Sequence, residues 1–159
     1  LFLSIASDLE RRTPGRFRFT MVGPATRASS PHVAFTGPIG DPHQIAGIYA
    51  EHDILLVTST REGHCLVVTE AMANGLVVLS TPVGDIADRV SRDTGLLTSA
   101  TDEGVVRDEM RKRILEFDGD RALLRSSKER ARDLIRDRYS SELFARYYRG
   151  LLVGTSDPS

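Results

Sequence analysis

The feature that most constrains the fold is a strand, a helix and a second strand in the middle of the chain. Residues 53–58 and residues 77–80 are short, strongly apolar runs, and each predicts a buried strand. Residues 66–74 lie between them and predict a short helix. Two buried strands joined by a helical crossover are typical of a parallel sheet that helices cover on both faces. The centre of the chain therefore predicts an α/β fold.

Segments of both kinds continue this alternation toward both ends of the chain. The further helices are predicted at residues 2–12, from Pro42 to about Glu51, and at residues 86–91. The further strands are predicted at residues 17–22, 32–36 and 95–98, with a loop at residues 23–31. Asp41 and Asp85 stand where their side chains can cap the helices that follow them. The whole succession predicts a Rossmann-like parallel sheet with helices on both faces.

The last third of the chain has a helical pattern. From Asp102 onward, apolar residues recur at helical spacing. Gly119 is expected to end one helix, Asp120 to cap the next, and Ser141 to begin a third. We therefore expect residues 1–153 to form a single domain with a helical C-terminal region, and residues 154–159 to form a flexible tail.

Composition excludes several classes of function. The 159 residues carry a net charge of −1, and the Arg-rich segment 107–138 is interleaved with acids, so we expect no nucleic-acid partner. No apolar run approaches the roughly 18 residues of a membrane span, and no signal-peptide pattern is present. Cys65 is the only cysteine, which rules out an internal disulfide. We expect a cytoplasmic protein, and we leave open whether a longer parent attaches peripherally to a membrane.

The sequence offers no metal site and no familiar cofactor motif. The four histidines (His32, His43, His52 and His64) do not have the spacing of metal ligands. There is no G-x-G-x-x-G after the first strand and no P-loop. We therefore expect the protein to use neither a metal nor a cofactor.

The loop between the central strand and its helix carries the candidate binding residues. It follows the carboxyl end of a strand, where ligands bind in open parallel sheets. Gly63 lets a ligand approach the main chain, and neither Cys65 nor Leu66 can cap the helix, so its first N–H groups remain for a phosphate. Glu62 and Glu70 are acceptors for sugar hydroxyls. The combination indicates a ligand that is part phosphate and part sugar.

Two simpler interpretations of these carboxylates remain open. Ser59-Thr60-Arg61-Glu62 matches a capping box, in which Glu62 would close the N-terminus of a helix. Glu70 could be a solvated carboxylate on the surface of a helix.

The same residues resemble a known signature. Glu62 and Glu70, with seven residues between them and Ala71-Met72-Ala73 and Gly75 behind, resemble the E-x7-E motif of retaining GT-B glycosyltransferases, most closely the GT4-type enzymes. Other segments stand in the family's order, namely residues 19–23, 33–37, 49, 53–57 and 80–84. The resemblance covers roughly residues 1–150.

The resemblance implies a divided enzyme. GT-B enzymes have two Rossmann-like domains, and this chain resembles the C-terminal, donor-binding one. The N-terminal acceptor-binding domain, the first strand of the family's sheet, and an Arg and a Lys that neutralise the donor diphosphate would then precede residue 1. The full-length parent would transfer a sugar from a nucleotide-sugar donor to an acceptor with retention, without a metal. The isolated chain is expected to be inactive.

The resemblance also assigns roles to individual residues. Glu62 would hold the transferred sugar and is the candidate catalytic residue, and Glu70 would hold the ribose hydroxyls. The diphosphate and sugar would contact the N–H groups of Gly63, His64, Cys65, Leu66 and Val67. Pro38 and Ile39 would contact the nucleotide base through the main chain.

Some residues depart from the family pattern. An aromatic residue and then Gly or Pro commonly occupy the positions of His64 and Cys65, and Gly often stands at Asp85 and Pro at Val77. His64 could hydrogen-bond the donor or be a solvated loop residue, whereas Cys65 is better explained as a packing residue than as a nucleophile. These departures leave the identity of the donor open.

Two further hypotheses and one structural question remain. The chain could be a nucleotide- or sugar-binding module without catalysis. A receiver-like switch domain is disfavoured, because Asp53 precedes its strand instead of following it. Without the family's first strand, the strands at 17–22 and 53–58 would face each other across a gap. We expect the gap to close by direct pairing, or to be filled by another chain or segment.

Overall fold

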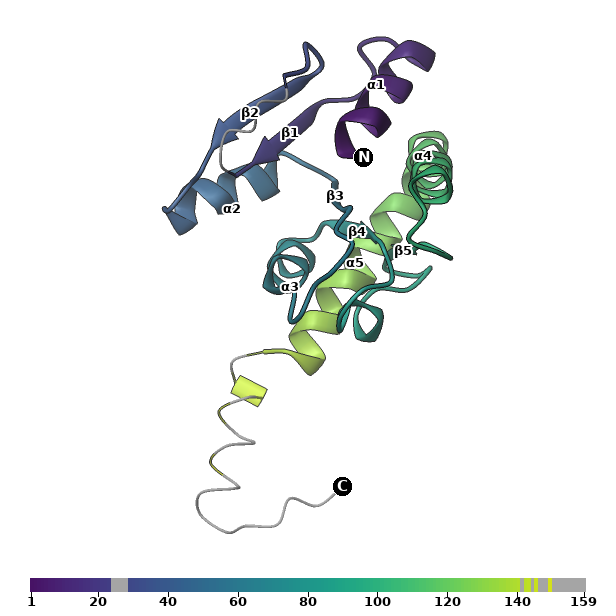
Figure 1. The fold of residues 1–159 in the computed structure, drawn as a ribbon. Coiled ribbons are helices and arrows are strands. Elements are labelled where there is room, and N and C mark those ends of the chain that lie inside the picture. The colour runs from purple at the N-terminus through teal and green to yellow at the C-terminus, as the bar shows by residue number, and fades with distance from the viewer. Residues whose placement is uncertain (24–28, 141, 144, 146–148, 150–159) are drawn as a thin grey trace.

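The computed structural model describes residues 1–23, 29–140, 142–143, 145 and 149 (Figure 1). The helices are α1 (Phe2–Arg12), α2 (Pro42–Ala50), α3 (Leu66–Ala73), α4 (Glu103–Gly119) and α5 (Arg121–Arg138), with a 3-10 turn η1 (Ile86–Asp88). The strands are β1 (Phe19–Val22), β2 (Val33–Gly37), β3 (Ile54–Val57), β4 (Val77–Ser80) and β5 (Gly95–Leu97). From β2 to β5 each strand is followed by a helix or the 3-10 turn before the next strand, and the two long helices α4 and α5 come after β5, which confirms the α/β prediction.

The strands form two parallel sheets instead of one. β1 pairs with β2, beginning with Phe19 opposite Val33. The second sheet has the order β3-β4-β5, in which Ile54 lies opposite Val77 and Val78 lies opposite Gly95. Every pairing in both sheets is parallel, and α3 forms the crossover between β3 and β4.

Strand β4 is buried on both faces and separates two hydrophobic clusters. Val77 and Leu79 point into the cluster that α1 and α4 cover, to which Phe19 of β1 also belongs. Val78 points the opposite way, into the cluster formed with α3 and the second half of α5. This alternation along one strand places helices on both faces of the sheet, as predicted.

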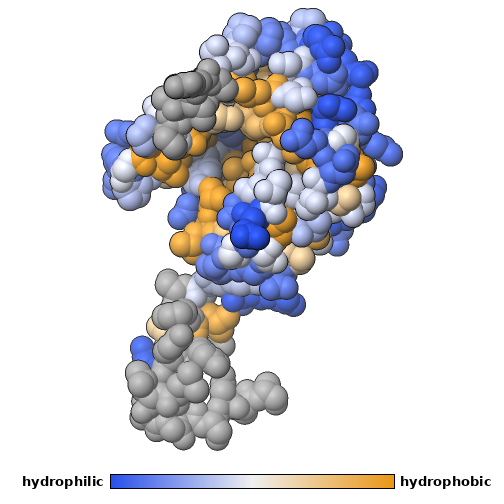
Figure 2. All heavy atoms as spheres, viewed as in Figure 1, coloured by the Kyte–Doolittle hydropathy of each residue, from blue (hydrophilic) through white to orange (hydrophobic). Residues whose placement is uncertain are grey.

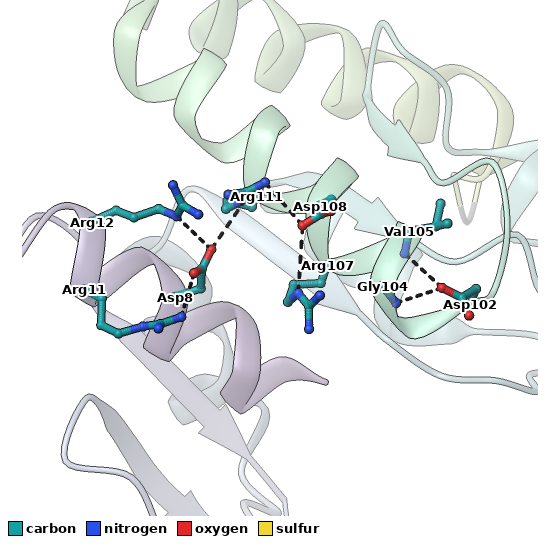
Figure 3. Close-up of polar contacts among 9 residues, drawn as sticks. All are labelled: Asp8, Arg11, Arg12, Asp102, Gly104, Val105, Arg107, Asp108 and Arg111. Carbon is teal, nitrogen blue, oxygen red and sulfur yellow. Dashed lines mark hydrogen bonds and ion pairs between the residues drawn. The ribbon is translucent and has the colours of Figure 1, made fainter.

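Helix α1 docks on α4 through a charged contact beside the core (Figure 3). The Asp8 carboxylate accepts hydrogen bonds from Arg11 at 2.8 Å and Arg12 at 3.1 Å on its own helix. It also lies 3.5 Å from the Arg111 side chain of α4. Figure 3 also shows the start of α4, where the Asp102 side chain accepts the N–H groups of the first turn. Ile5 and its buried neighbours pack beside this partly buried ion pair and supply the apolar part of the docking energy.

Two of the three helix caps predicted from aspartates are present. Asp41 accepts the N–H of His43 at 2.9 Å, and Asp120 accepts the N–H of Leu123 at 2.9 Å. The prediction that Asp85 caps a helix over residues 86–91 is wrong. Only the 3-10 turn η1 forms there, and no side-chain cap bond is made. The Asp85 carboxylate is instead engaged by groups from another loop, which are described below.

The C-terminal region agrees with the prediction as far as it is described. Helix α4 ends at Gly119, and α5 starts directly after Asp120. Residues 142, 143, 145 and 149 are helical. Ser141, Phe144, Tyr147, Tyr148 and Leu151 of the expected third helix, and the whole of the expected tail at 154–159, lie outside the described residues. The described residues contain no helix long and apolar enough to span a bilayer.

A cleft of about 1250 Å³ separates β1 from β3. Figure 2 shows hydrophobic residues around the hollow between the β1–β2 part and the rest of the molecule. Side chains bridge it: Arg18 donates to the Glu51 carbonyl at 2.7 Å, and the Thr20 hydroxyl lies 2.9 Å from His52 Nε2. No main-chain ladder joins β1 and β3 in the described part of the chain, so the prediction of direct pairing is wrong. Filling of the gap by another chain or segment remains a prediction.

Candidate functional site

The loop that follows β3 leads to a helix without a side-chain cap. β3 ends at Val57, and α3 begins at Leu66 with Cys65 at the N-cap position. The Cys65 side chain makes no capping hydrogen bond, which confirms the expectation that it cannot cap the helix. Residues 59–62 form no helix, so Glu62 does not close one and the capping-box interpretation is wrong. At this start the Cys65 N–H donates to the Asp85 carboxylate at 3.4 Å and the Leu66 N–H to the His64 carbonyl at 3.1 Å, so only some of the first N–H groups are available to a ligand.

The turn that follows β4 hydrogen-bonds to this loop and packs against it. The Thr81 hydroxyl donates to the Ser59 carbonyl at 2.6 Å, and the Asp85 N–H donates to the Gly63 carbonyl at 3.4 Å. Gly84 has φ +58, and a Cβ on it would lie 2.5 Å from the Gly63 oxygen. Only glycine fits between the turn and the loop, since it tolerates this φ and has no Cβ. The loop is therefore held in place before any ligand binds.

The Asp85 carboxylate is the polar centre of this arrangement. It contacts His64 Nδ1 and the Arg89 guanidinium, and it accepts the Cys65 N–H at 3.4 Å. Burial would raise the pKa of the Asp85 carboxyl, but the hydrogen bonds from His64 and Cys65 and the charge on Arg89 outweigh it and hold the pKa below its usual range. Asp85 is therefore an anion that ties the loop to the turn.

Arg89 supplies a buried positive charge under the loop. Its side chain is only 1% exposed. One guanidinium nitrogen donates to the Thr69 hydroxyl of α3 at 3.0 Å, and the group lies 5.9 Å from the centre of the Tyr139 ring. Its Nε is buried without a hydrogen-bond partner in the part of the chain that the structure describes. A buried charge of this kind needs an anionic partner, and Asp85 is that partner.

Glu70 is exposed on α3 and is contacted from the other side of the cleft. The Tyr49 hydroxyl, carried by α2, donates to Glu70 Oε2 at 3.4 Å. Burial, together with the neighbouring Glu70 carboxylate, raises the pKa of Tyr49 to about 12. The tyrosine therefore stays protonated and remains a donor to Glu70. The simpler view of Glu70 as a purely solvated carboxylate does not account for this contact.

The structure brings some of the predicted site residues together. The cleft is lined near the loop by Ile39, Glu62, Cys65, Val67 and Glu70. Pro38, Gly63, His64 and Leu66 are exposed and lie outside this lining. The cationic lining residues Arg16, Arg18 and Arg121 belong to the opposite, amino-terminal end of the strands. The loop end of the cleft therefore carries the carboxylates Glu62 and Glu70, and its hydrogen-bond donors are mainly main-chain N–H groups.

Cys65 behaves as a packing residue. It is 5% exposed and belongs to the cluster formed with α3 and α5. Burial and the charge of Glu62 raise the pKa of its thiol, which disfavours the reactive thiolate.

Sequence reasoning missed the partners Tyr49, Asp85 and Arg89. The position of Asp85 before residues 86–91 predicts only a local cap, which does not form, whereas its departure from the family pattern, shared with His64, is the signal that marks it. Within the described ranges, no group of three or more His, Cys, Asp or Glu side chains could hold a metal ion. Independence of metal remains a prediction.

The fold and the loop together define the class of the protein. The parallel strands with their covering helices and the two long helices α4 and α5 match the C-terminal domain of a GT-B glycosyltransferase. The C-terminal domain of a group 1 glycosyltransferase (LpcC) from Francisella tularensis superposes with a TM-score of 0.74 at 21% identity, over 88% of this chain and 78% of that one. HepE from Anabaena, in complex with UDP-glucose, gives 0.76 at 19% identity, over 95% of this chain and 44% of that one.

The sequence comparisons identify the family. The family model for glycosyl transferases group 1 matches residues 1–115. This chain belongs to that family. It is 32% identical over 111 residues to N-acetyl-alpha-D-glucosaminyl L-malate synthase of Bacillus anthracis. The match covers 69% of this chain but only 28% of the length of that relative.

Proposed function

We propose that this chain binds the nucleotide-sugar donor of a retaining glycosyltransferase at the loop end of the cleft. The observation that carries the proposal is the uncapped start of α3 between two carboxylates, Glu62 and Glu70, at the carboxyl end of β3. Free N–H groups at a helix start suit a diphosphate, and flanking carboxylates suit sugar hydroxyls. The family assignment and the relatives whose structures contain UDP or UDP-glucose support the same ligand class.

The proposed roles follow from position. Glu70 accepts the two ribose hydroxyls, and the Tyr49 hydroxyl steadies its carboxylate. Glu62 contacts the transferred sugar. The N–H groups of Gly63, His64 and Val67 contact the diphosphate and sugar, because the Cys65 and Leu66 N–H groups already donate to Asp85 and to the His64 carbonyl. Ile39, which lines the cleft, and Pro38 beside it contact the base through the main chain.

The test is a binding panel of UDP, GDP, ADP and their glucose conjugates by isothermal titration calorimetry, on the parent and on Glu70→Ala. Hydrogen bonds to a charged group contribute about 1.5–3 kcal/mol, so Glu70→Ala should weaken the preferred nucleotide roughly tenfold to a hundredfold. The matched control is Glu129→Ala, which removes an exposed glutamate from α5, away from the cleft. Equal affinities in Glu70→Ala and the parent would rule out the ribose role.

Transfer itself is proposed for a longer protein. The match spans 28% of the curated relative, and the geometry of transfer needs donor and acceptor held together, which can lower a barrier by roughly 7–11 kcal/mol. We propose that a second, acceptor-binding domain supplies that geometry and that this chain alone transfers no sugar. A transfer assay on a longer parent would also distinguish an enzyme from a non-catalytic binding module.

A further inference from the structure

Two unusual residues at the candidate site lie against each other. His64 and Asp85 are 21 positions apart, and each departs from the pattern common in the family. The structure places the His64 ring on the Asp85 carboxylate through Nδ1. A pair of departures in direct contact indicates a shared role, and such a role can be tested by combining the two substitutions.

We propose that Asp85 is a positioning residue that holds His64 so that the imidazole Nε2 contacts the part of the donor beyond its α-phosphate. The inference rests on the proposed function, since it adds a residue to that same site. The ligand chemistry is a β-phosphate oxygen or a hydroxyl of the transferred sugar. A β-phosphate oxygen accepts a hydrogen bond from Nε2 when the ring is charged. A sugar hydroxyl can do the same, and it can also donate to Nε2 of a neutral ring that carries its proton on Nδ1.

The carboxylate is fixed from behind, which a casual surface contact would not require. Arg89, 1% exposed, pairs with one Asp85 oxygen, and the Cys65 N–H reaches the same oxygen at 3.4 Å. The other oxygen is left for His64 Nδ1. A ring held through Nδ1 has a defined tautomer and orientation, as a ligand-binding histidine needs.

A structural role alone explains the arrangement poorly. The His64 side chain is 60% exposed, and exposed ion pairs contribute little to folding stability. The buried Arg89 also balances the charge of Asp85, so the carboxylate does not make the start of α3 anionic. A phosphate can therefore approach the N-terminus of α3 while Asp85 holds the histidine.

The experiment uses a ligand series, UMP, UDP and UDP-glucose, or the matching series of another base if the panel selects it. Calorimetry compares the parent with His64→Ala, Asp85→Asn and the double variant, after circular dichroism has shown that each is folded. We expect His64→Ala to bind UMP within about twofold of the parent and to weaken UDP or UDP-glucose at least about fivefold. The step at which the loss appears shows whether phosphate or sugar is contacted.

Asp85→Asn should reproduce that loss in the parent and add nothing in the His64→Ala background, and Asp85→Glu should restore part of it. In ¹⁵N NMR, the His64 ring of the parent should carry its proton on Nδ1, and Asp85→Asn should remove this preference. The positioning role would be overturned if the affinity losses of His64→Ala and Asp85→Asn added up in the double variant, or if UMP binding fell as much as UDP binding. It would also be overturned if Asp85→Asn bound UDP more tightly, or if it left the tautomer of the His64 ring unchanged. If the unsubstituted chain binds no nucleotide of any series, the proposed function is overturned, and this inference with it.

Discussion

Replacing Gly84 by alanine tests whether the turn after β4 controls the binding loop. Gly84 has φ +58, so alanine there is strained by roughly 1–2 kcal/mol. Its Cβ would also lie 2.5 Å from the Gly63 oxygen and 2.8 Å from the Glu62 oxygen. Ordinary contact needs roughly 3.5 Å, so the loop must move by about 1 Å. The displaced residues are the ones that carry the proposed sugar and phosphate contacts.

The chain contains a matched control for the backbone strain. Gly15 has φ +69, but nothing lies within 4 Å of its Cβ position, and it is remote from the loop. Gly15→Ala should therefore show the strain alone, about 1–2 kcal/mol, or a fall in melting temperature of roughly 2–8 °C. Gly84→Ala should lose at least as much stability. It should also bind the preferred nucleotide at least about tenfold more weakly, whereas Gly15→Ala should bind it normally.

The assay combines thermal unfolding by circular dichroism with calorimetric titration of the same nucleotide at a temperature where both variants are folded. Equal nucleotide affinities in the two variants would refute the reasoning, because the contact between Gly84 and the loop would then have no effect on the site. Normal binding in Gly84→Ala with a large loss of stability would lead to the same conclusion.

Three further outcomes are expected. Arg113→Ala should lower the free energy of unfolding in urea by about 2–4 kcal/mol, because the 6% exposed Arg113 side chain donates to the Gly95 and Arg92 carbonyls. The control Arg125→Ala, at an exposed position, should change it by less than about 0.5 kcal/mol. Similar values for both variants would contradict this. Burial tends to raise the pKa of Asp53, but Lys128 and Arg121 outweigh burial and lower that pKa. The ionised Asp53 therefore stabilises the fold above the unfolded pKa of about 4, and this stabilisation is lost as the pH falls further. Asp53→Asn should flatten the fall in melting temperature between about pH 5 and 3, and parallel curves of melting temperature against pH for the two proteins would argue against this role. EDTA should leave nucleotide affinity unchanged, since no described cluster of ligands could hold a metal ion, and a strict need for Mg²⁺ or Mn²⁺ would contradict this.

Local patterns predicted most of the fold. Apolar periodicity located the helices and strands, and Asp41 and Asp120 act as the caps their positions indicated, because a cap needs only neighbouring N–H groups. Asp85 failed as a cap because it had other partners, His64 and Arg89, which sequence spacing does not reveal.

Contacts between distant segments account for the other differences. The cleft between β1 and β3 depends on how Arg18 and Thr20 meet the segment before β3, and no periodicity encodes that spacing. At the site, the uncapped α3 was predictable from Cys65, whereas the Tyr49 contact with Glu70 joins separate helices and emerged only in three dimensions.

The open edge of β3 has a consequence for how this molecule exchanges hydrogen with solvent. The Asp53 and Val57 carbonyls bond toward β4, so the Ile54 and Leu56 amides, which alternate with them, point at the cleft. Deuterium therefore enters one strand at two speeds, fast at Ile54 and Leu56 and slow at Leu55 and Val57, although all four residues are neighbours. Protection appearing at the two fast amides alone would report any segment that docks along this edge, residue by residue, without a change elsewhere in the sheet.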